Sequence, residues 1–221
     1  MKNIQILYED EQFVVFDKPT GLLVTPAPGK DQKVFTDIVN EQYDDGRGRL
    51  HPCHRLDQMT SGAIIYARGK NNQQCMREIF HDGDIQKTYF AFVKGRVKEK
   101  KGTIQSTIKD FHQKKFAGQS RGKLAITHYQ VVSYEKGFTV VKVQPKTGRT
   151  NQIRIHFAEI GHPLLGERVY AFRRDFNVDM KRLALHSYAL RFINPVTEKT
   201  ISVVSEMPQD MKEFLSSVCD N

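Results

Sequence analysis

Strand-like segments outnumber helix-like segments along this chain, and few strands alternate one-for-one with a helix. A doubly wound nucleotide-binding fold requires that alternation, because each parallel strand returns through a crossover helix. We therefore predict an α+β fold, with a mixed, largely antiparallel sheet flanked by helices. Strands are expected at 5–8, 13–16, 62–67, 87–93, 103–108, 124–134, 138–143, 183–192 and 199–204, and helices at 36–43, 71–81, 150–160 and 211–218.

One segment in the second half of the chain changes from strand to helix periodicity. Ile153, Phe157 and Ile160 fall at positions i, i+4 and i+7, which predicts an apolar face directed at the core. Thr150 is a suitable N-cap for this helix, and Gly161 would stop it. A short amphipathic helix is therefore expected between them.

The sequence shows no domain boundary, since it contains no internal repeat, low-complexity tract or Gly/Ser linker. A chain of 221 residues can bury one sizeable core. We therefore predict a single domain over residues 1–221. It should carry a basic hairpin insertion near 105–127, because the polar stretch 109–123 lies between two strand-like segments.

The charge balance is strongly basic. Lys and Arg total 34 against 25 acidic residues, which gives a net charge of +9 and a pI near 9.4. Such a balance favours a polyanionic partner, through phosphate contacts and counterion release. RNA, DNA and an acidic membrane surface all satisfy this requirement. The basic residues gather at 94–101, 109–123 and 168–182.

Targeting and redox signals point to the cytoplasm. No segment approaches the roughly 20 apolar residues of a spanning helix, and the N-terminus lacks the apolar core of a signal peptide. Cys53, Cys75 and Cys219 are odd in number and widely scattered. A disulfide framework is therefore not expected, and a reducing compartment fits better. We predict no membrane association.

Motifs for metal and nucleotide chemistry are incomplete. The segment 51–54 (HPCH) crowds three possible ligands, but no second pair completes a tetrahedral set, so no metal site is predicted. The sequence also lacks a phosphate-binding loop, a GxSxG nucleophile turn and a GxGxxG turn.

An acid, a tyrosine and an arginine remain as candidates for chemistry. Asp57 lies in a loop-like region, residues 50–61, just ahead of the apolar run 63–67, where a strand end could hold it rigidly. Arg154 lies near the edge of the apolar helix face, from which it could reach a buried carboxylate. Tyr89 could stack on a base and offer a hydroxyl. Each also has a purely structural interpretation, as a surface ion pair beside Arg55, a helix-surface arginine and an ordinary sheet tyrosine.

Three segments together resemble the signature motifs of the RluA-type RNA pseudouridine synthases. They are 54–57 (HRLD), 87–89 (KTY) and 148–156 (GRTNQIRIH). Further agreement comes from 17–22 (DKPTGL), 161–166 (GHPLLG) and 183–187 (LALHS). The resemblance runs from about Ile6 to Pro208, and the order and separation of the motifs make it specific.

The resemblance implies isomerisation of uridine to pseudouridine within RNA. Asp57 would be the nucleophile, Arg154 would pair with it, and Tyr89 would pack on the base and help to remove the C5 proton. Nothing enters or leaves overall, so no cofactor is expected. The substrate would be a ribosomal RNA or transfer RNA stem-loop, bound by a monomer without a protein partner.

RNA binding is assigned to two sets of residues. By analogy with the family, Arg55 would fill the gap left when the target nucleotide flips, because its planar guanidinium suits stacking. The other expected contacts are His54, Arg149 and Asn151 near the pocket, and Lys109, Lys114, Lys115, Arg121 and Lys123 at the hairpin tip.

Two departures from the family pattern stand out. Asn151 occupies a position where the family usually has histidine. Many members also carry an S4-type RNA-binding domain ahead of the catalytic domain, whereas here the catalytic pattern starts at the first strand. We therefore expect the catalytic domain and its basic loops to bind RNA without an S4 domain.

Two other functions remain open from the residues alone. A non-catalytic RNA-binding module would explain the charge, but not why Asp57, Tyr89 and Arg154 occur together. A phosphotransferase with an aspartate nucleophile would need a second carboxylate at DxD spacing to hold magnesium, and residues 57–59 (DQM) offer none.

Overall fold

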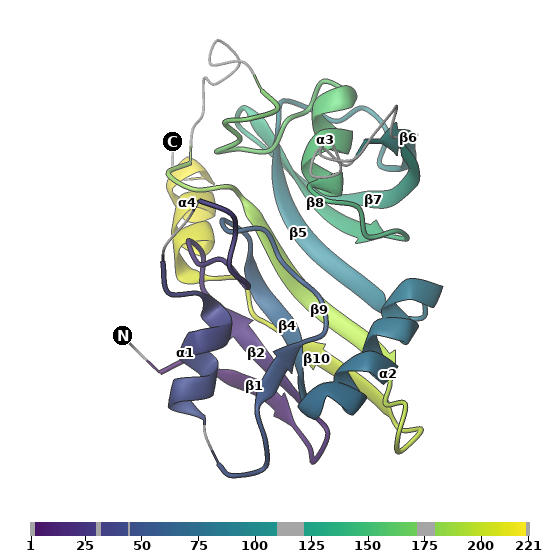
Figure 1. Cartoon of the computed structure of the whole chain (residues 1–221). Coiled ribbons are helices and arrows are strands. Elements are labelled where there is room, and N and C mark those ends of the chain that lie inside the picture. The colour runs from purple at the N-terminus through teal and green to yellow at the C-terminus, as the bar shows by residue number, and fades with distance from the viewer. Residues whose placement is uncertain (1–2, 30–31, 44, 110–121, 172–179, 220–221) are drawn as a thin grey trace. The chain divides into compact units, whose positions relative to one another are not determined.

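The computed structural model describes residues 3–29, 32–43, 45–109, 122–171 and 180–219 (Figure 1). The chain divides into two compact units, Met1–Lys87 with Leu185–Gln209, and Thr88–Ala184 with Asp210–Asn221. The predicted α+β class with a largely antiparallel sheet is confirmed, whereas a single domain over residues 1–221 stays a prediction.

The first unit combines six strands and two helices among its described residues. Its elements are β1 (Ile6–Glu9), β2 (Phe13–Lys18), α1 (Phe35–Gln42), β3 (Leu50–Pro52), β4 (Ser61–Arg68), α2 (Gly69–Asp82), β9 (Leu185–Ile193) and β10 (Thr200–Val204). The strand order is β1-β2-β4-β9, with β10 on β9 and β3 on β4. The β4–β9 pairing is parallel and the others are antiparallel.

Strand β4 is buried on both faces, as its continuous apolar run predicts. Ile65 belongs to a core cluster that includes Met76 of α2. Tyr66 points the other way and meets Phe35 of α1, with ring centroids 5.9 Å apart. The two helices therefore cover opposite faces of this strand (Figure 1), which fixes the register of the strand that follows Asp57.

The second unit is built on four antiparallel strands. Its elements are β5 (Gln86–Lys94), β6 (Lys101–Ile108), β7 (Lys123–Glu135), β8 (Phe138–Pro145), α3 (Gln152–Glu159) and α4 (Gln209–Cys219), and its strand order is β5-β8-β7-β6. Phe157 of α3 packs on Tyr129 of β7, with centroids 5.6 Å apart. Strands β6 and β7 form the predicted hairpin, but its tip, 110–121, lies outside the described residues.

The structure corrects three local predictions. Residues 50–52 form strand β3, rather than part of a loop, because they pair with the end of β4. The N-cap of α3 is Asn151 instead of Thr150, since Asn151 has a left-handed backbone (φ 56°) and its carbonyl accepts the N–H of Ile155. Asparagine tolerates that conformation better than a β-branched residue.

The third correction concerns the buried face of α3. Ile160 was expected to point inward, but it follows the last helical turn and is 38% exposed. Gln152 and His156 are buried instead, and both hydrogen-bond the hydroxyl of Thr127 at 2.9 Å. The apolar period therefore placed Ile153 and Phe157 correctly but missed the buried polar side chains that hydrogen-bond Thr127.

Among the described residues, no helix is long and apolar enough to cross a membrane.

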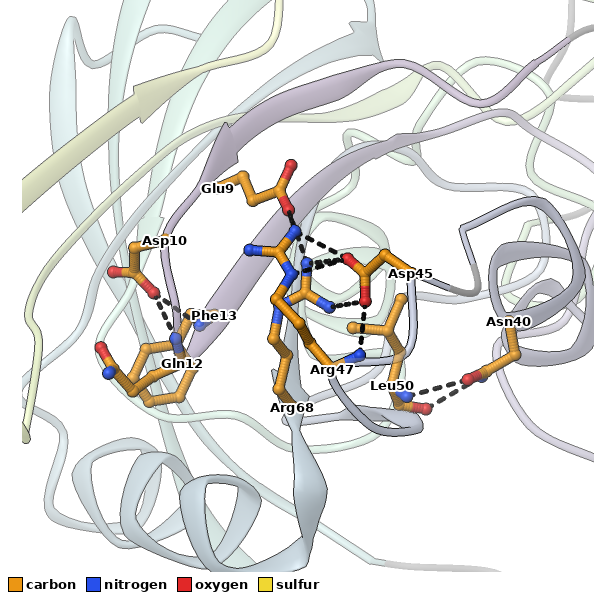
Figure 2. Close-up of polar contacts among 9 residues, drawn as sticks. All are labelled: Glu9, Asp10, Gln12, Phe13, Asn40, Asp45, Arg47, Leu50 and Arg68. Atoms are coloured by element: carbon orange, nitrogen blue, oxygen red, sulfur yellow. Dashed lines mark hydrogen bonds and ion pairs between the residues drawn. The ribbon is translucent and has the colours of Figure 1, made fainter.

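A group of charged residues fastens the loop before β3 to the sheet (Figure 2). The buried guanidinium of Arg68, at the end of β4, donates to Glu9 at 2.5 Å and to Asp45 at 3.0 Å. Arg47, which is half exposed, bonds the same two carboxylates. Hydrogen bonds from the backbone and side chain of Arg47 lower the pKa of Asp45 to about 2, so Asp45 stays ionised.

Replacing Arg68 by Met should lower the free energy of unfolding by about 2 kcal/mol. The loss falls below the ~3–5 kcal/mol of a fully buried pair, because Glu9 and Asp45 still reach water. Arg47→Met is the matched control and should cost less than about 1 kcal/mol, as expected for an exposed pair. Urea unfolding of both variants measures the difference, and equal losses would contradict the assigned role of Arg68.

Candidate active site

The turn that carries Asp57 joins β3 to β4 in the first unit. The carbonyl of Asp57 accepts the N–H of Thr60 at 3.0 Å, which closes the turn. Along it, Arg55 is exposed, Leu56 is buried and Asp57 is half-buried. The exposure of Arg55 suits the stacking role expected for it, and Asp57 lies just ahead of the first residue of β4.

A buried lysine supports this turn from below. Lys18, at the end of β2, is fully buried, and its ammonium donates to the carbonyls of Gln58 at 3.2 Å and Thr60 at 2.9 Å. A third bond goes to the carbonyl of Pro19 at 2.9 Å. Because carbonyls of both Gln58 and Thr60 converge on one charge, the backbone after Asp57 has little freedom.

The neighbouring segment makes further bonds to the same turn. The N–H of Gly21 donates to the carbonyl of Gln58 at 2.8 Å, and the side-chain amide of Gln58 returns a bond to the carbonyl of Gly21 at 3.0 Å. The hydroxyl of Thr20 donates to the carbonyl of Met59 at 2.8 Å. The sequence did not predict that this segment supports the Asp57 turn, and the structure shows that it does.

The far end of the turn is anchored by a chain of buried polar groups. Ser61, the first residue of β4, hydrogen-bonds Nδ1 of His186 at 3.0 Å. On the other side of the ring, Nε2 of His186 lies 2.9 Å from the carbonyl of Ser205, whose hydroxyl donates to Asp17 at 2.9 Å. Burial raises the pKa of Asp17, against the opposing effects of Ser205 and His186.

His54 anchors the near end of the turn. Its Nε2 accepts the backbone N–H of Ile65 at 3.1 Å, and its ring lies against Phe80 with centroids 4.5 Å apart. Burial, together with the charge of Lys87, lowers the pKa of His54 to about 3. A neutral ring is what this bond requires, because only an unprotonated nitrogen can accept. His54 was expected to contact RNA, and the structure gives it a role in holding the loop.

The depressed pKa of His54 predicts acid destabilisation. The unfolded chain binds this proton below about pH 6.5, whereas the folded protein resists it down to about pH 3. Each pH unit in that window should therefore remove up to ~1.4 kcal/mol of the free energy of unfolding. His54→Gln, whose side-chain oxygen can replace Nε2 as acceptor, should fall less steeply. Urea unfolding at pH 7, 6 and 5 measures the slopes.

The control for that series is His81→Gln, because His81 lies in solvent on α2. Identical slopes for wild type and His54→Gln would show that His54 does not carry the pH dependence.

Tyr89 lies on β5 in the second unit and is only 8% exposed. Its cross-strand neighbour on β8 is Val143, which pairs in turn with Tyr129 of β7. Residues paired across a sheet share a face, so Tyr89 lies on the face that α3 covers through the contact of Phe157 with Tyr129. The structure thus places Tyr89 and Arg154 on the same side of this sheet.

Arg154 has a carboxylate partner that sequence reasoning missed. Its Nε and Nη2 donate to the two carboxylate oxygens of Glu167 at 2.7 and 2.8 Å. Its Nη1 donates to the side-chain oxygen of Asn151 at 2.8 Å. The side chain of Arg154 is 15% exposed and that of Glu167 is fully buried. Pairing of Arg154 with Asp57, which belongs to the other unit, stays a prediction.

Asn151, the departure from the family pattern, belongs to the same group. While its oxygen accepts from Arg154, its amide nitrogen donates to the hydroxyl of Tyr170 at 2.9 Å. The guanidinium also lies over the ring of Tyr170, 5.1 Å from its centroid. Its expected contact with RNA stays a prediction, and these bonds show that Asn151 links the start of α3 to the loop after Gly166.

The remaining predicted RNA contacts lie around the β6–β7 hairpin. Arg149 donates from Nε to the carbonyl of Leu124 at 3.2 Å, which places it beside the start of β7. Lys109 directly follows β6 and Lys123 is the first residue of β7, and both are exposed. Lys114, Lys115 and Arg121 lie outside the described residues.

A basic hollow of about 400 Å³ lies on the sheet formed by β6, β7 and β8. It was not predicted from the sequence. Lys101 and Lys142 line it together with His128 and Gln144. Lys142 pairs with Phe90 on β5, the neighbour of Tyr89. Successive strand residues face opposite ways, so the side chain of Lys142 lies on the other face of the sheet from that of Tyr89.

Comparison with known proteins identifies the family. Residues 12–159 match the RNA pseudouridylate synthase family model, and this range contains Asp57, Tyr89 and Arg154. An uncharacterized RNA pseudouridine synthase of Aquifex aeolicus is 35% identical over 96% of this chain and 72% of its own length. The dual-specificity RNA pseudouridine synthase RluA of Pasteurella multocida is 33% identical over 90% of this chain and 91% of its own.

A solved structure gives the same result. The human RNA pseudouridylate synthase domain containing 4 superimposes with a TM-score of 0.78 and 25% identity, over 97% of this chain and 92% of that one. Coverage of 97% of this chain means that the agreement extends over both units. The chain therefore belongs to the RNA pseudouridine synthase family, whose members are isomerases.

Proposed function

We propose that this protein isomerises a specific uridine in structured RNA, a ribosomal RNA or transfer RNA stem-loop, with Asp57 as the nucleophile. The N1–C1′ glycosidic bond breaks, the uracil turns, and a C5–C1′ bond forms. The proton lost from C5 is balanced by one gained at N1, so substrate and product are isomers. No external reactant is needed for this balance.

The observation that carries the proposal is the construction of the Asp57 turn. Lys18 and Ser61 hold its end and His54 holds its beginning, while the exposed Arg55 remains available to the RNA. Rigid support around one acid is what a positioned nucleophile requires. The chain belongs to a family of isomerases. Isomerase activity therefore has stronger support than either a phosphotransferase or a purely RNA-binding module.

Tyr89 and Arg154 complete the proposed catalytic set. Tyr89 packs on the target base and assists removal of the C5 proton, and Arg154 pairs with the carboxylate of Asp57. The Pasteurella relative is named for dual specificity, which supports more than one RNA substrate here, and ribosomal RNA and transfer RNA both stay candidates. Arg55, the hairpin tip and Arg149 supply the RNA contacts. Location in the cytoplasm and a monomeric state stay predictions from the sequence.

The test is conversion of defined RNA. Total ribosomal and transfer RNA from cells lacking this protein should be missing pseudouridine at one or a few sites, and the purified protein should restore it there. Chemical mapping of pseudouridine before and after addition measures the change. If the RNA from these cells loses no site and the protein restores none, the proposed substrate class is wrong.

A further inference from the structure

The guanidinium of Arg154 is fixed in its plane by two separate partners. An arginine side chain carries five N–H donors in a rigid fork. Glu167 takes one on Nε and one on Nη2, and Asn151 takes one on Nη1. Three of the five donors are therefore committed to these two partners, which fixes both the plane and the direction of the guanidinium.

Glu167 is itself held firmly. Its side chain is fully buried, and one of its oxygens accepts the backbone N–H groups of Arg168, Val169 and Tyr170 at 2.9, 2.8 and 3.3 Å. Burial opposes ionisation of Glu167, but the hydrogen bonds and charge of Arg154, with the N–H groups of Val169 and Tyr170, outweigh it and lower its pKa. The carboxylate therefore presents a fixed negative charge to Arg154.

The backbone before Glu167 has one permitted arrangement. Gly166 has a φ of +75°, and a Cβ at this position would lie 2.0 Å from the carbonyl oxygen of Arg182. No other residue fits so close to that backbone. On either side, the backbone of Leu165 hydrogen-bonds Phe92 and Ala184 at 2.9 Å. The loop is thus tied to β5 and cannot shift Glu167 without breaking these bonds.

We propose that Glu167, braced by Asn151 and Tyr170, is a positioning residue that aims Arg154 at the reacting group. This role rests on the proposed function, because it assigns Arg154 to the catalytic set. The paired carboxylate of Glu167 offsets the positive charge of Arg154, so the pair as a whole is neutral. Arg154 therefore acts on the reacting group through the direction of its N–H donors rather than through an added positive charge. Asn151 in place of the family histidine serves this purpose through its bonds to both Arg154 and Tyr170.

A second ion pair in the same unit provides the matched control. Arg182 donates from Nε and Nη2 to the two oxygens of Asp210 at 2.6 and 3.0 Å, the same two-bond geometry. That pair joins the chain after the loop to the start of α4 and includes no residue assigned to chemistry. Breaking it reports what the loss of a comparable ion pair does to folding alone.

The experiment compares Glu167→Gln with Asp210→Asn. Glutamine keeps the size of glutamate but lacks its charge and offers Arg154 an amide in place of one oxygen. We expect the single-turnover rate of pseudouridine formation, per folded molecule, to fall about 100-fold in Glu167→Gln, since a misplacement near 1 Å has that effect. RNA affinity should change by less than about threefold. Asp210→Asn should keep the wild-type rate per folded molecule.

A spectroscopic readout tests the same contact without catalysis. The Nε–H of Arg154, assigned by its absence in Arg154→Lys, should be protected from exchange with water in the wild type and unprotected in Glu167→Gln. A wild-type rate in folded Glu167→Gln, an equal rate loss in Asp210→Asn, or unchanged protection of Arg154 would each overturn the proposal. If the wild type itself converts no RNA, the proposed function fails, and the exchange measurement alone then decides whether Glu167 holds Arg154.

Discussion

Asp57→Asn is expected to fold and to bind RNA, yet to form no detectable pseudouridine, even under single-turnover conditions. Asparagine has nearly the size and shape of aspartate but cannot act as an anionic nucleophile. The turn should survive, because its supports use the backbone carbonyls of Asp57, Gln58 and Thr60. We expect the rate to fall by at least ~10⁴-fold, the order seen when nucleophiles are removed elsewhere.

The matched control for Asp57→Asn is Asp84→Asn, an exposed acid in the same unit, which should behave as wild type. Chemical detection of pseudouridine gives the rate, fluorescence titration gives RNA affinity, and thermal unfolding gives stability. Unaltered isomerisation by Asp57→Asn would disprove the proposed mechanism, and loss of folding would mean that Asp57 is chiefly structural.

Tyr89→Phe should reduce the rate by about 10² to 10⁴, because general acid–base assistance is typically worth that much. The ring stays in place, since its position is set by β5 and its pairing with Val143. Binding of RNA and stability should therefore change little. Rapid-quench measurement of pseudouridine formation gives the rate.

The comparison for Tyr89→Phe is Tyr129→Phe, on the same sheet face but two strands away, which should retain the wild-type rate. Near-normal turnover by Tyr89→Phe would remove the hydroxyl from the mechanism and leave the ring as a stacking surface only.

The elements that could be predicted from the sequence are those with a local signature. The apolar run of β4 shows directly that both faces are covered, and α2 ends at Gly83, which adopts the left-handed conformation (φ 87°) that glycine favours. The apolar period of α3 predicted its buried face less well, because a pattern of apolar residues does not show which polar residues are buried. Gln152 and His156 are buried because they hydrogen-bond Thr127. Burial of polar groups depends on partners, and partners come from the tertiary fold.

The same reason explains which parts of the site were missed. Asp57, Tyr89 and Arg154 could be proposed from the sequence, but the residues that support them could not. Lys18 looks like a surface lysine in sequence, since the carbonyls it meets lie 40 and 42 residues further on. Glu167 follows a glycine in a turn-like motif and gives no local sign that three backbone N–H groups converge on it. A motif locates reacting groups, whereas only the fold shows what holds them.

The bond between Ser61 and His186 has a consequence for how the protein is made. The two residues are 125 positions apart, and β4 acquires β9 as its parallel neighbour only through this late segment. At translation rates of roughly 5–20 residues per second, His186 is synthesised about 6 to 25 s after Ser61. During that interval the strand following the Asp57 turn lacks one neighbour, whereas strands β6, β7 and β8 pair with segments close in sequence. A nascent polypeptide that already contains Asp57, Tyr89 and Arg154 is therefore expected to be inactive until residues 185–209 emerge from the ribosome.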